Sequence, residues 1–180
     1  MKEAYFAGGC FWCIAPTFRT LQGVKKVVSG YSGGSEINPS YEQVKSGLTN
    51  HRETIYICYD EEAISYKELL QIFLWNIDPF DSEGQFIDKG HSYTLAVYYK
   101  TSEEYQIAFQ MISQLKAESN KQPFISLEQF KSFYPAEEYH QNYDLKNPLL
   151  FQKELEESGR TEFFGSSTKV VERPSDRRQG

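Results

Sequence analysis

The chain has little cysteine and little histidine, and these shortages exclude several classes of protein. Its 180 residues include three cysteines and three histidines. Three cysteines, an odd number, are poor material for a small secreted domain that disulfides hold together. Two of them, Cys10 and Cys13, lie three positions apart, which favours redox or nucleophilic chemistry for this pair.

The three histidines do not have the spacing of a metal site. His51, His91 and His140 are scattered along the chain and show no ligand spacing. We therefore expect no bound metal ion. His140, which lies in the stretch EEYHQ, is expected to support a binding pocket rather than to take part in chemistry.

Long apolar runs and clustered positive charge are also missing. No stretch approaches the ~20 apolar residues that span a bilayer, and the start, MKEAYFAGGC, is too short and too polar for a signal peptide. The formal net charge is -6, whereas nucleic-acid binding needs clustered lysine and arginine. We expect a cytoplasmic protein that binds neither nucleic acid nor membrane, is a monomer by default, and acts on a small neutral or peptide substrate.

The composition predicts one folded domain and a polar tail. The chain is 39% apolar and long enough to bury a core of its own. From Gly165 the sequence changes to GSSTKVVERPSDRRQG, which has almost no apolar residues. We therefore expect one folded domain over residues 1–164 and a flexible tail over 165–180.

Apolar periodicity predicts alternating strands and helices. Strands are expected over 3–8, 24–31, 53–60, 93–99 and 124–127, and helices over 13–21, 66–77, from 102 onward, and in the stretch NPLLFQKELEE. The pairs Ser65 with Glu68 and Thr101 with Glu104 have the spacing of capping boxes. Residues 32–40 and 78–92 are expected to be loops. This order predicts an α+β sheet with helices packed on it.

Pro16 constrains the start of the helix that follows the cysteines. Proline has no N–H and clashes in the interior of a helix, so we expect this helix to begin no earlier than about Cys13. Cys10 then lies in the turn after Gly8 and Gly9. A helix N-terminus presents free N–H groups and the positive end of its dipole, and both favour a thiolate. The turn is therefore expected to activate Cys10.

One pair of cysteines leaves other interpretations open. A single CxxC is half of a zinc site, but no second CxxC or CxxH occurs in this sequence. Cys13, about one helical turn after Cys10, is within reach for a disulfide. Cys58 stands alone in a predicted strand and is expected to be a small buried apolar residue.

The motif GGCFWC resembles the active-site signature of the A-type peptide methionine sulfoxide reductases, in the subset that has CFWC. The similarity continues in the family's order through TFRTLQGV, GYSGG, NPSYEQVKSGLTNHRE, ISYKELLQIF, IDKGHSY and YPAEEYHQNY, over about residues 3–157. The resemblance implies an α+β two-layer sandwich on a ferredoxin-like core. It also implies reduction of the S epimer of methionine sulfoxide, free or in proteins, as repair of oxidative damage.

The resemblance implies a role for each matching residue. Cys10 is the nucleophile, and Glu53 protonates the sulfoxide oxygen. Phe11 and Trp12 form the pocket for the methyl group. Tyr31 and Tyr93 hold the oxygen, and Asp88 helps to hold the substrate.

Physical chemistry supports these roles. A sulfoxide has an apolar methyl group and a polar S=O, so its site needs an aromatic wall beside hydrogen-bond donors. Protonation of the oxygen needs a neutral carboxylic acid. Burial among aromatic side chains must therefore raise the pKa of Glu53 from ~4.3 toward neutrality.

The sequence departs from the family pattern at two places. Many relatives have glycine or alanine after CFW and a recycling cysteine in the C-terminal tail, whereas this tail has none. Cys13 is thus expected to form the disulfide with Cys10, and an external dithiol such as thioredoxin to reduce it, without a bound cofactor. A glutamate common in the family is Ala15 here. This difference bears on the expected first turn of the helix and on none of the predicted catalytic groups.

Two alternatives come from other functional classes. A thioredoxin-like dithiol-disulfide oxidoreductase also has a strand, a CxxC and a helix in this order, although Phe11 and Trp12 would crowd a protein disulfide. A peptide-binding module with an aromatic cage would leave both cysteines reduced in the presence of methionine sulfoxide.

Overall fold

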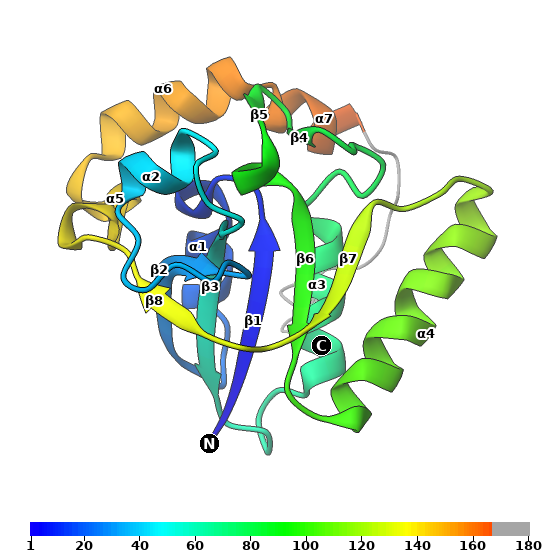
Figure 1. The fold of residues 1–180 in the computed structure, drawn as a ribbon. Coiled ribbons are helices and arrows are strands. Elements are labelled where there is room, and N and C mark those ends of the chain that lie inside the picture. The colour runs from blue at the N-terminus through cyan, green and yellow to red at the C-terminus, as the bar shows by residue number, and fades with distance from the viewer. Residues whose placement is uncertain (167–180) are drawn as a thin grey trace.

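The structure, a computed structural model, describes residues 1–166 and is built on one mixed sheet. In spatial order its strands are β7 (Ile125–Gln129), β6 (Leu95–Tyr99), β1 (Lys2–Gly8), β3 (Arg52–Tyr59), β2 (Val24–Ser32) and β8 (Phe133–Pro135). Neighbouring strands are antiparallel except β6 and β7, which are parallel. A short hairpin, β4 (Gly84–Gln85) and β5 (Asp88–Lys89), lies above the sheet in Figure 1.

Seven α-helices lie in the described part of the chain. They are α1 (Phe11–Arg19), α2 (Tyr41–Lys45), α3 (Tyr66–Trp75), α4 (Ser102–Ser119), α5 (Tyr143–Lys146), α6 (Pro148–Ser158) and α7 (Arg160–Ser166). Two single 3-10 turns occur at His91–Tyr93 and Glu138–His140. In Figure 1, α1 and α3 lie behind the sheet, and α6 and α7 run across its upper end.

The central strands confirm the ferredoxin-like core. The elements β1, α1, β2, β3, α3 and β6 follow each other in the βαββαβ order, and their strands lie side by side as β6-β1-β3-β2. This arrangement places both crossover helices on the same face of the sheet. The strands β7 and β8 extend the core at its two edges. The expected α+β sandwich is confirmed.

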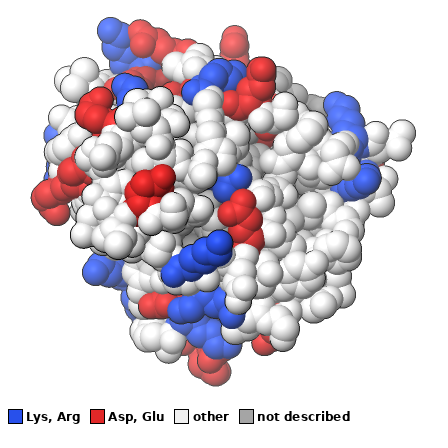
Figure 2. Space-filling view, viewed as in Figure 1, with Lys and Arg blue, Asp and Glu red and all other residues white. Residues whose placement is uncertain are grey.

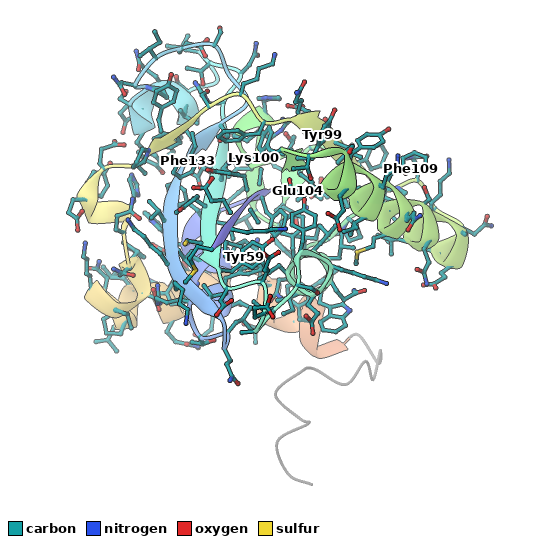
Figure 3. The ribbon with its side chains drawn as sticks, turned by 90° about the horizontal axis from the view of Figure 1, so that it is seen from below. Tyr59, Tyr99, Lys100, Glu104, Phe109 and Phe133 are labelled. Atoms are coloured by element: carbon teal, nitrogen blue, oxygen red, sulfur yellow. The ribbon has the colours of Figure 1, made fainter. Side chains whose placement is uncertain are left out.

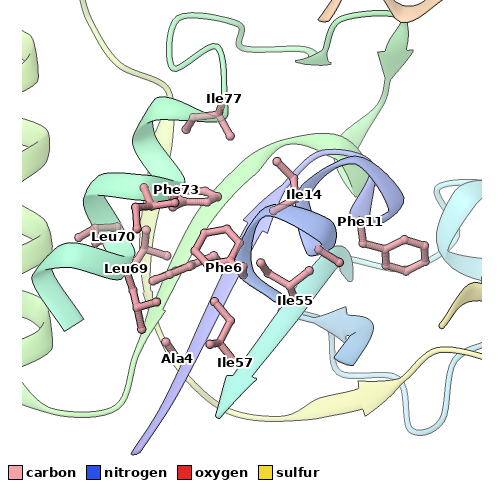
Figure 4. Close-up of a cluster of buried hydrophobic side chains, with 14 of the residues drawn as sticks. Ala4, Phe6, Phe11, Ile14, Ile55, Ile57, Leu69, Leu70, Phe73 and Ile77 are labelled. Atoms are coloured by element: carbon pink, nitrogen blue, oxygen red, sulfur yellow. The ribbon is translucent and has the colours of Figure 1, made fainter. Parts of the chain in front are cut away.

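The main core lies between the sheet and α1 and α3. Phe6, Ile55 and Ile57 point from the strands toward Ile14 of α1 and Leu69 of α3 (Figure 4). The ring of Phe6 stacks on that of Phe73 with centroids 5.0 Å apart. Burial of alternate residues along β1 and β3 therefore holds both helices on this face, as the period of two in the sequence predicts.

The opposite face of the sheet carries a smaller aromatic cluster. Tyr5 and Tyr98 are buried there beneath the connection from β7 to β8, which crosses in front of β1 in Figure 1. Phe130 of this connection stacks on Tyr5 with centroids 4.1 Å apart, and Phe133, labelled in Figure 3, packs nearby. A surface groove of about 550 Å³ opens beside this cluster, and neither Cys10 nor Cys13 lines it.

Capping explains where two of the helices begin. The side chain of Ser65 accepts from the backbone N–H of Glu68, whose carboxylate accepts from Ser65 in return, as the sequence predicts. At α4 the side chain of Thr101 accepts from the N–H of Glu104, but the Glu104 carboxylate accepts from the N–H of Lys100 instead. Figure 3 shows Lys100 and Glu104 together at this end of α4.

The prediction for the first helix is wrong at its start. The helix begins at Phe11 and contains Pro16 in its interior. The helical face that includes Phe11 and Ile14 is buried, and the N–H of Phe11 has an acceptor in the carboxyl group of Glu53. These contacts stabilise a first turn that the proline alone disfavours.

Several short elements are missing from the sequence-based prediction. The helix α2 begins at Tyr41 and has Ser40 as its N-cap, which forms a full capping box with Gln43. The predicted loop over 78–92 contains the hairpin β4–β5. The strand β8 pairs with β2 at Gly30, where an added Cβ would lie 2.3 Å from the ring of Phe133. Of the tail expected over 165–180, the first two residues end α7, and 167–180 lie outside the described residues.

Charged side chains of both signs are interspersed on the face seen in Figure 2, where much of the surface is uncharged. None of the helices in residues 1–166 combines the length and apolar character that crossing a membrane requires.

Candidate active site

Cys10 lies at the junction between β1 and α1, as the sequence predicts. It is the N-cap residue of α1. The preceding Gly9 has a φ of +82°, and an added Cβ there would lie 2.7 Å from the Cβ of Gln85. Only glycine allows this left-handed turn so close to the β4–β5 hairpin. Cys10 and Cys13 are half-buried, free thiols, and the N–H of Cys13 donates to the carbonyl of Cys10 (3.1 Å).

The two thiols share a hydrogen bond that shifts their pKa values in opposite directions. The hydrogen bond with Cys13 raises the pKa of the Cys10 thiol well above its ordinary value, and burial and the Glu53 carboxyl raise it further. The hydrogen bond from Cys10 lowers the pKa of Cys13, and the positive charge of Arg160 lowers it further against the effect of burial.

Glu53 is a buried carboxylic acid next to the start of α1. It lies on β3 and is 3% exposed. Its Oε2 accepts a hydrogen bond of 3.0 Å from the N–H of Phe11, the residue after Cys10. Burial raises the pKa of Glu53 to about 8; the Phe11 amide opposes this rise, and the nearby Asp88 adds to it. The burial that the sequence-based hypothesis requires of Glu53 is present, and its pKa shifts in the predicted direction.

The structure corrects the assignment of one of the two tyrosines. Tyr31 is the cross-strand neighbour of Glu53, but its hydroxyl donates to Oε1 of Glu137 (2.9 Å) and its side chain is fully buried. That hydroxyl is occupied by a structural partner. Glu137 also accepts from the N–H of Tyr41 (3.1 Å), so Tyr31 and Glu137 together position the start of α2.

Tyr41 lies where the sequence-based hypothesis puts Tyr31. Its hydroxyl lies close to that of Tyr93, and burial followed by the charge of Glu53 raises its pKa. Burial and Glu53 also raise the pKa of Tyr93, and Cys10 contributes to both shifts. Two neutral hydroxyl groups therefore lie beside the acid and the thiol. A signal was present in the stretch NPSYEQV, because Ser40 and Gln43 have capping spacing and begin a helix with Tyr41.

The two aromatic residues after Cys10 have different environments. Phe11 is buried and contacts the rings of Tyr31 and His140. Trp12 is half-buried, stacks on Tyr143 with centroids 3.8 Å apart and planes 8° apart, and donates from Nε1 to Nδ1 of His140 (3.1 Å). Trp12 is thus a rigid aromatic surface next to Cys10.

His140 supports this wall, as its sequence context predicts. It is 1% exposed, and burial lowers its pKa although Glu137 opposes the shift. Because Nδ1 accepts the indole N–H, the neutral imidazole carries its proton on Nε2. The other two histidines form structural contacts with backbone carbonyls, His51 with Glu36 (2.8 Å) and His91 with Asn50 (2.9 Å).

Asp88 and Arg160 complete the surroundings of the cysteines. Asp88 is half-buried on β5, and burial raises its pKa while Arg160, Lys45 and Lys89 lower it. Arg160 is 5% exposed at the start of α7. The sequence contains no signal for this position of Arg160, because a single arginine near a charged C-terminal stretch is usually a surface residue.

The site contains two cysteines at the start of a helix, and beside them lie a neutral carboxylic acid, two hydroxyl groups and an indole. This combination defines a thiol-dependent redox enzyme. Such a site can attack a polarised substrate with one sulfur, protonate it from the acid and close a disulfide with the second sulfur.

Comparisons with known proteins identify the family. The family model described as peptide methionine sulfoxide reductase matches residues 2–170. Peptide methionine sulfoxide reductase MsrA of Halalkalibacterium halodurans is 42% identical over 166 residues, which are 91% of this chain and 94% of that protein. MsrA 2 of Staphylococcus aureus strain MRSA252 is 42% identical over 167 residues, 92% and 94% of the two chains. The chain belongs to the peptide methionine sulfoxide reductase family.

Solved structures agree with this result. Mxr1 of Saccharomyces cerevisiae in its reduced form superposes with a TM-score of 0.78 at 28% identity, covering 82% of this chain and 86% of that one. Methionine sulfoxide reductase A of Corynebacterium diphtheriae superposes with a TM-score of 0.74 at 28% identity, covering 82% and 76% of the two chains.

Proposed function

We propose that this protein reduces the S epimer of methionine sulfoxide, free or in peptides and proteins, to methionine, and so repairs oxidative damage. The observation that carries the proposal is the buried acid Glu53, which is held 3.0 Å from the amide that follows Cys10 and keeps its proton near neutral pH. Reduction of a sulfoxide needs such an acid, because the S=O oxygen must be protonated before it can leave sulfur.

The reductive step uses Cys10 and Glu53. The Cys10 sulfur forms a bond to the sulfoxide sulfur while Glu53 donates its proton to the oxygen. The oxygen then passes to Cys10, methionine leaves, and the proton of the Cys10 thiol returns to the Glu53 carboxylate. Cys10 ends as a sulfenic acid, so the substrate sulfur is reduced and the Cys10 sulfur oxidised by two electrons.

Neighbouring side chains orient the substrate. The hydroxyl groups of Tyr41 and Tyr93, beside Glu53, can donate to the oxygen as negative charge develops on it. Trp12, held by His140 and Tyr143, faces the substrate methyl group. Asp88, whose charge acts on Cys10 and Glu53 alike, helps to hold the substrate.

The cycle closes through Cys13 and an external dithiol. The Cys13 thiolate attacks the Cys10 sulfenic sulfur, the S–O bond breaks, and hydroxide leaves and is protonated to water. Thioredoxin, or another dithiol, then reduces the disulfide, and no bound cofactor is needed. Mxr1, one of the similar structures, has also been determined in complex with Trx2. The cytoplasm and the monomeric state stay predictions from composition.

The thioredoxin-like alternative is not supported. The chain belongs to the reductase family, and the residues between its cysteines are packed against the protein rather than open to a protein disulfide. Phe11 is 1% exposed, and Trp12 is tied to His140.

Single-turnover analysis of cysteine variants tests the proposal. Cys10→Ser should form no methionine. Cys13→Ser should form about one equivalent per protein and then stop with thioredoxin as reductant, because the sulfenic acid has no partner for a disulfide. Cys58→Ser is the matched control, since Cys58 lies on β3 away from the pair and should leave turnover unchanged. Sustained turnover of Cys13→Ser with thioredoxin would show that Cys13 does not resolve the sulfenic acid.

A further inference from the structure

Arg160 is a buried arginine at the first position of α7. The left-handed Gly159, with a φ of +80°, ends α6, and the N–H of Arg160 then donates to the hydroxyl of Ser158 (3.2 Å). The chain thus turns sharply at this point and directs a side chain that is 5% exposed inward. A cationic side chain at this depth needs partners, because burial of an unpaired charge is costly.

The partners of Arg160 are two backbone carbonyls and an aromatic ring. Nη1 donates to the carbonyl of Asn76 (3.1 Å), and Nη2 donates to the carbonyl of Gly8 (3.3 Å). The guanidinium lies 4.5 Å from the centroid of Phe86. Asn76 is the C-cap of α3, so its carbonyl lies at the negative end of that helix dipole.

No carboxylate within the described residues forms an ion pair with Arg160 at salt-bridge distance. Its positive charge is therefore balanced by carbonyl dipoles, by the ring of Phe86 and, at longer range, by Asp88, whose pKa it lowers. Such a charge favours negative charge on nearby groups, because the interior screens it less than water does.

The guanidinium lies directly beneath the cysteine turn. Gly8, whose carbonyl it binds, is two residues before Cys10, and a Cβ added to Gly9 would lie 3.5 Å from Nη2. The same guanidinium links this turn to the end of α3. Four charged or titratable groups act on the Cys13 thiol. Cys10 carries a thiol, Asp88 and Glu154 carry carboxyl groups, and Arg160 carries a positive charge.

We propose that Arg160 is a positioning residue for the resolving step: it fixes the Gly8–Cys10 turn against α3 and, as a buried cation, favours the Cys13 thiolate that attacks the Cys10 sulfenic acid. This inference rests on the proposed function and adds a residue to its second half. In the step, the S–S bond forms, the S–O bond breaks, and hydroxide leaves and takes a proton to become water. The sulfenic acid is the oxidant, so no further reactant is required.

Rapid-mixing single turnover separates the two halves of the reaction. Methionine is measured after quenching, and the remaining sulfenic acid is trapped with a 1,3-dione and measured by mass spectrometry. Arg160→Met should form its first equivalent of methionine within about twofold of the wild-type rate but lose sulfenic acid several-fold more slowly, since removal of the cation lowers the thiolate fraction of Cys13. The pH profile of this second step should move to higher pH.

Two variants separate charge from structure. Arg160→Lys keeps the cation but not the two-carbonyl geometry, and it should restore the pH profile while the resolving rate stays below wild type. Lys2→Gln is the control, because Lys2 is at the start of β1, at the other end of the strand from Gly8, and pairs at the surface with Glu61; it should match wild type in both steps. Circular dichroism and thermal unfolding show whether each variant folds. If Arg160→Met does not fold, the pH profile of the resolving step in Arg160→Lys tests whether the positive charge at position 160 favours the Cys13 thiolate.

Distinct results overturn the inference and the proposed function. If wild type forms no methionine, the proposed function fails. If wild type forms methionine and the Arg160 variants resolve at the wild-type rate and pH, this inference alone fails. It also fails if both steps slow together in Arg160→Met while the pH profile of that variant stays at the wild-type position, since that pattern indicates a purely structural role.

Discussion

Replacement of Glu53 by glutamine should abolish activity and stabilise the fold at the same time. The carboxyl group is 3% exposed, and its pKa is raised from 4.5 to about 8. Because the pKa of Glu53 is raised in the folded state, Glu53 leaves the folded state most stable below pH 4.5, where the acid is protonated in both the folded and the unfolded chain. Stability is then lost as the pH rises from 4.5 to about 8, while the unfolded chain ionises and the folded one does not.

The size of this effect follows from the shift. At pH 7 the unfolded acid is about 2.5 pH units above its pKa, which corresponds to about 3 kcal/mol of lost stability at 1.36 kcal/mol per unit. Glutamine keeps an oxygen for the Phe11 amide but cannot ionise. The variant Glu53→Gln should therefore be about 3 kcal/mol more stable than wild type at pH 7, and the two should have similar stability at pH 4.

The activity of the same variant should fall. Loss of a general acid costs typically 10²–10⁴-fold in rate, and wild-type activity itself should decrease above pH 8 as Glu53 loses its proton. Urea unfolding at pH 4 and pH 7, together with the pH dependence of kcat/KM, measures both effects. Activity of Glu53→Gln within a few-fold of wild type, or an equal pH dependence of stability in the two proteins, would refute the assignment.

Two further predictions concern the groups around the acid. Tyr41→Phe should lower kcat/KM by roughly 10- to 100-fold, as expected for one hydrogen bond to developing charge. Tyr31→Phe should instead mainly lower the free energy of unfolding, by about 1 kcal/mol. An equal loss of activity in both variants would restore Tyr31 to the site. His140→Leu removes the acceptor of the Trp12 indole N–H and should raise KM more than it lowers kcat, by an amount that corresponds to about 1–3 kcal/mol. His140→Gln can still accept this hydrogen bond and should recover much of the loss. An unchanged KM in His140→Leu would contradict a role for the Trp12–His140 hydrogen bond in substrate binding.

Local sequence patterns predicted much of the fold. The alternation of Ile55 and Ile57 with Tyr56 predicted the two faces of β3, and Ser65 with Glu68 predicted the start of α3. These signals are local because side-chain direction along a strand and capping of a helix depend on residues a few positions apart. The start of α1 could not be predicted in this way, because a distant carboxyl group satisfies the N–H of Phe11.

The sequence by itself determined the family motifs, the position of Cys10 at a strand-to-helix turn and the presence of an acid and aromatic residues for its chemistry. Only the tertiary structure decided that Tyr41 rather than Tyr31 lies with Tyr93 beside Glu53, and that Arg160 lies beneath the turn. The physical reason is the range of the interactions. A hydroxyl partner, a buried charge or a shifted pKa depends on groups that are up to 152 positions apart in the chain, and only the packed fold brings them together.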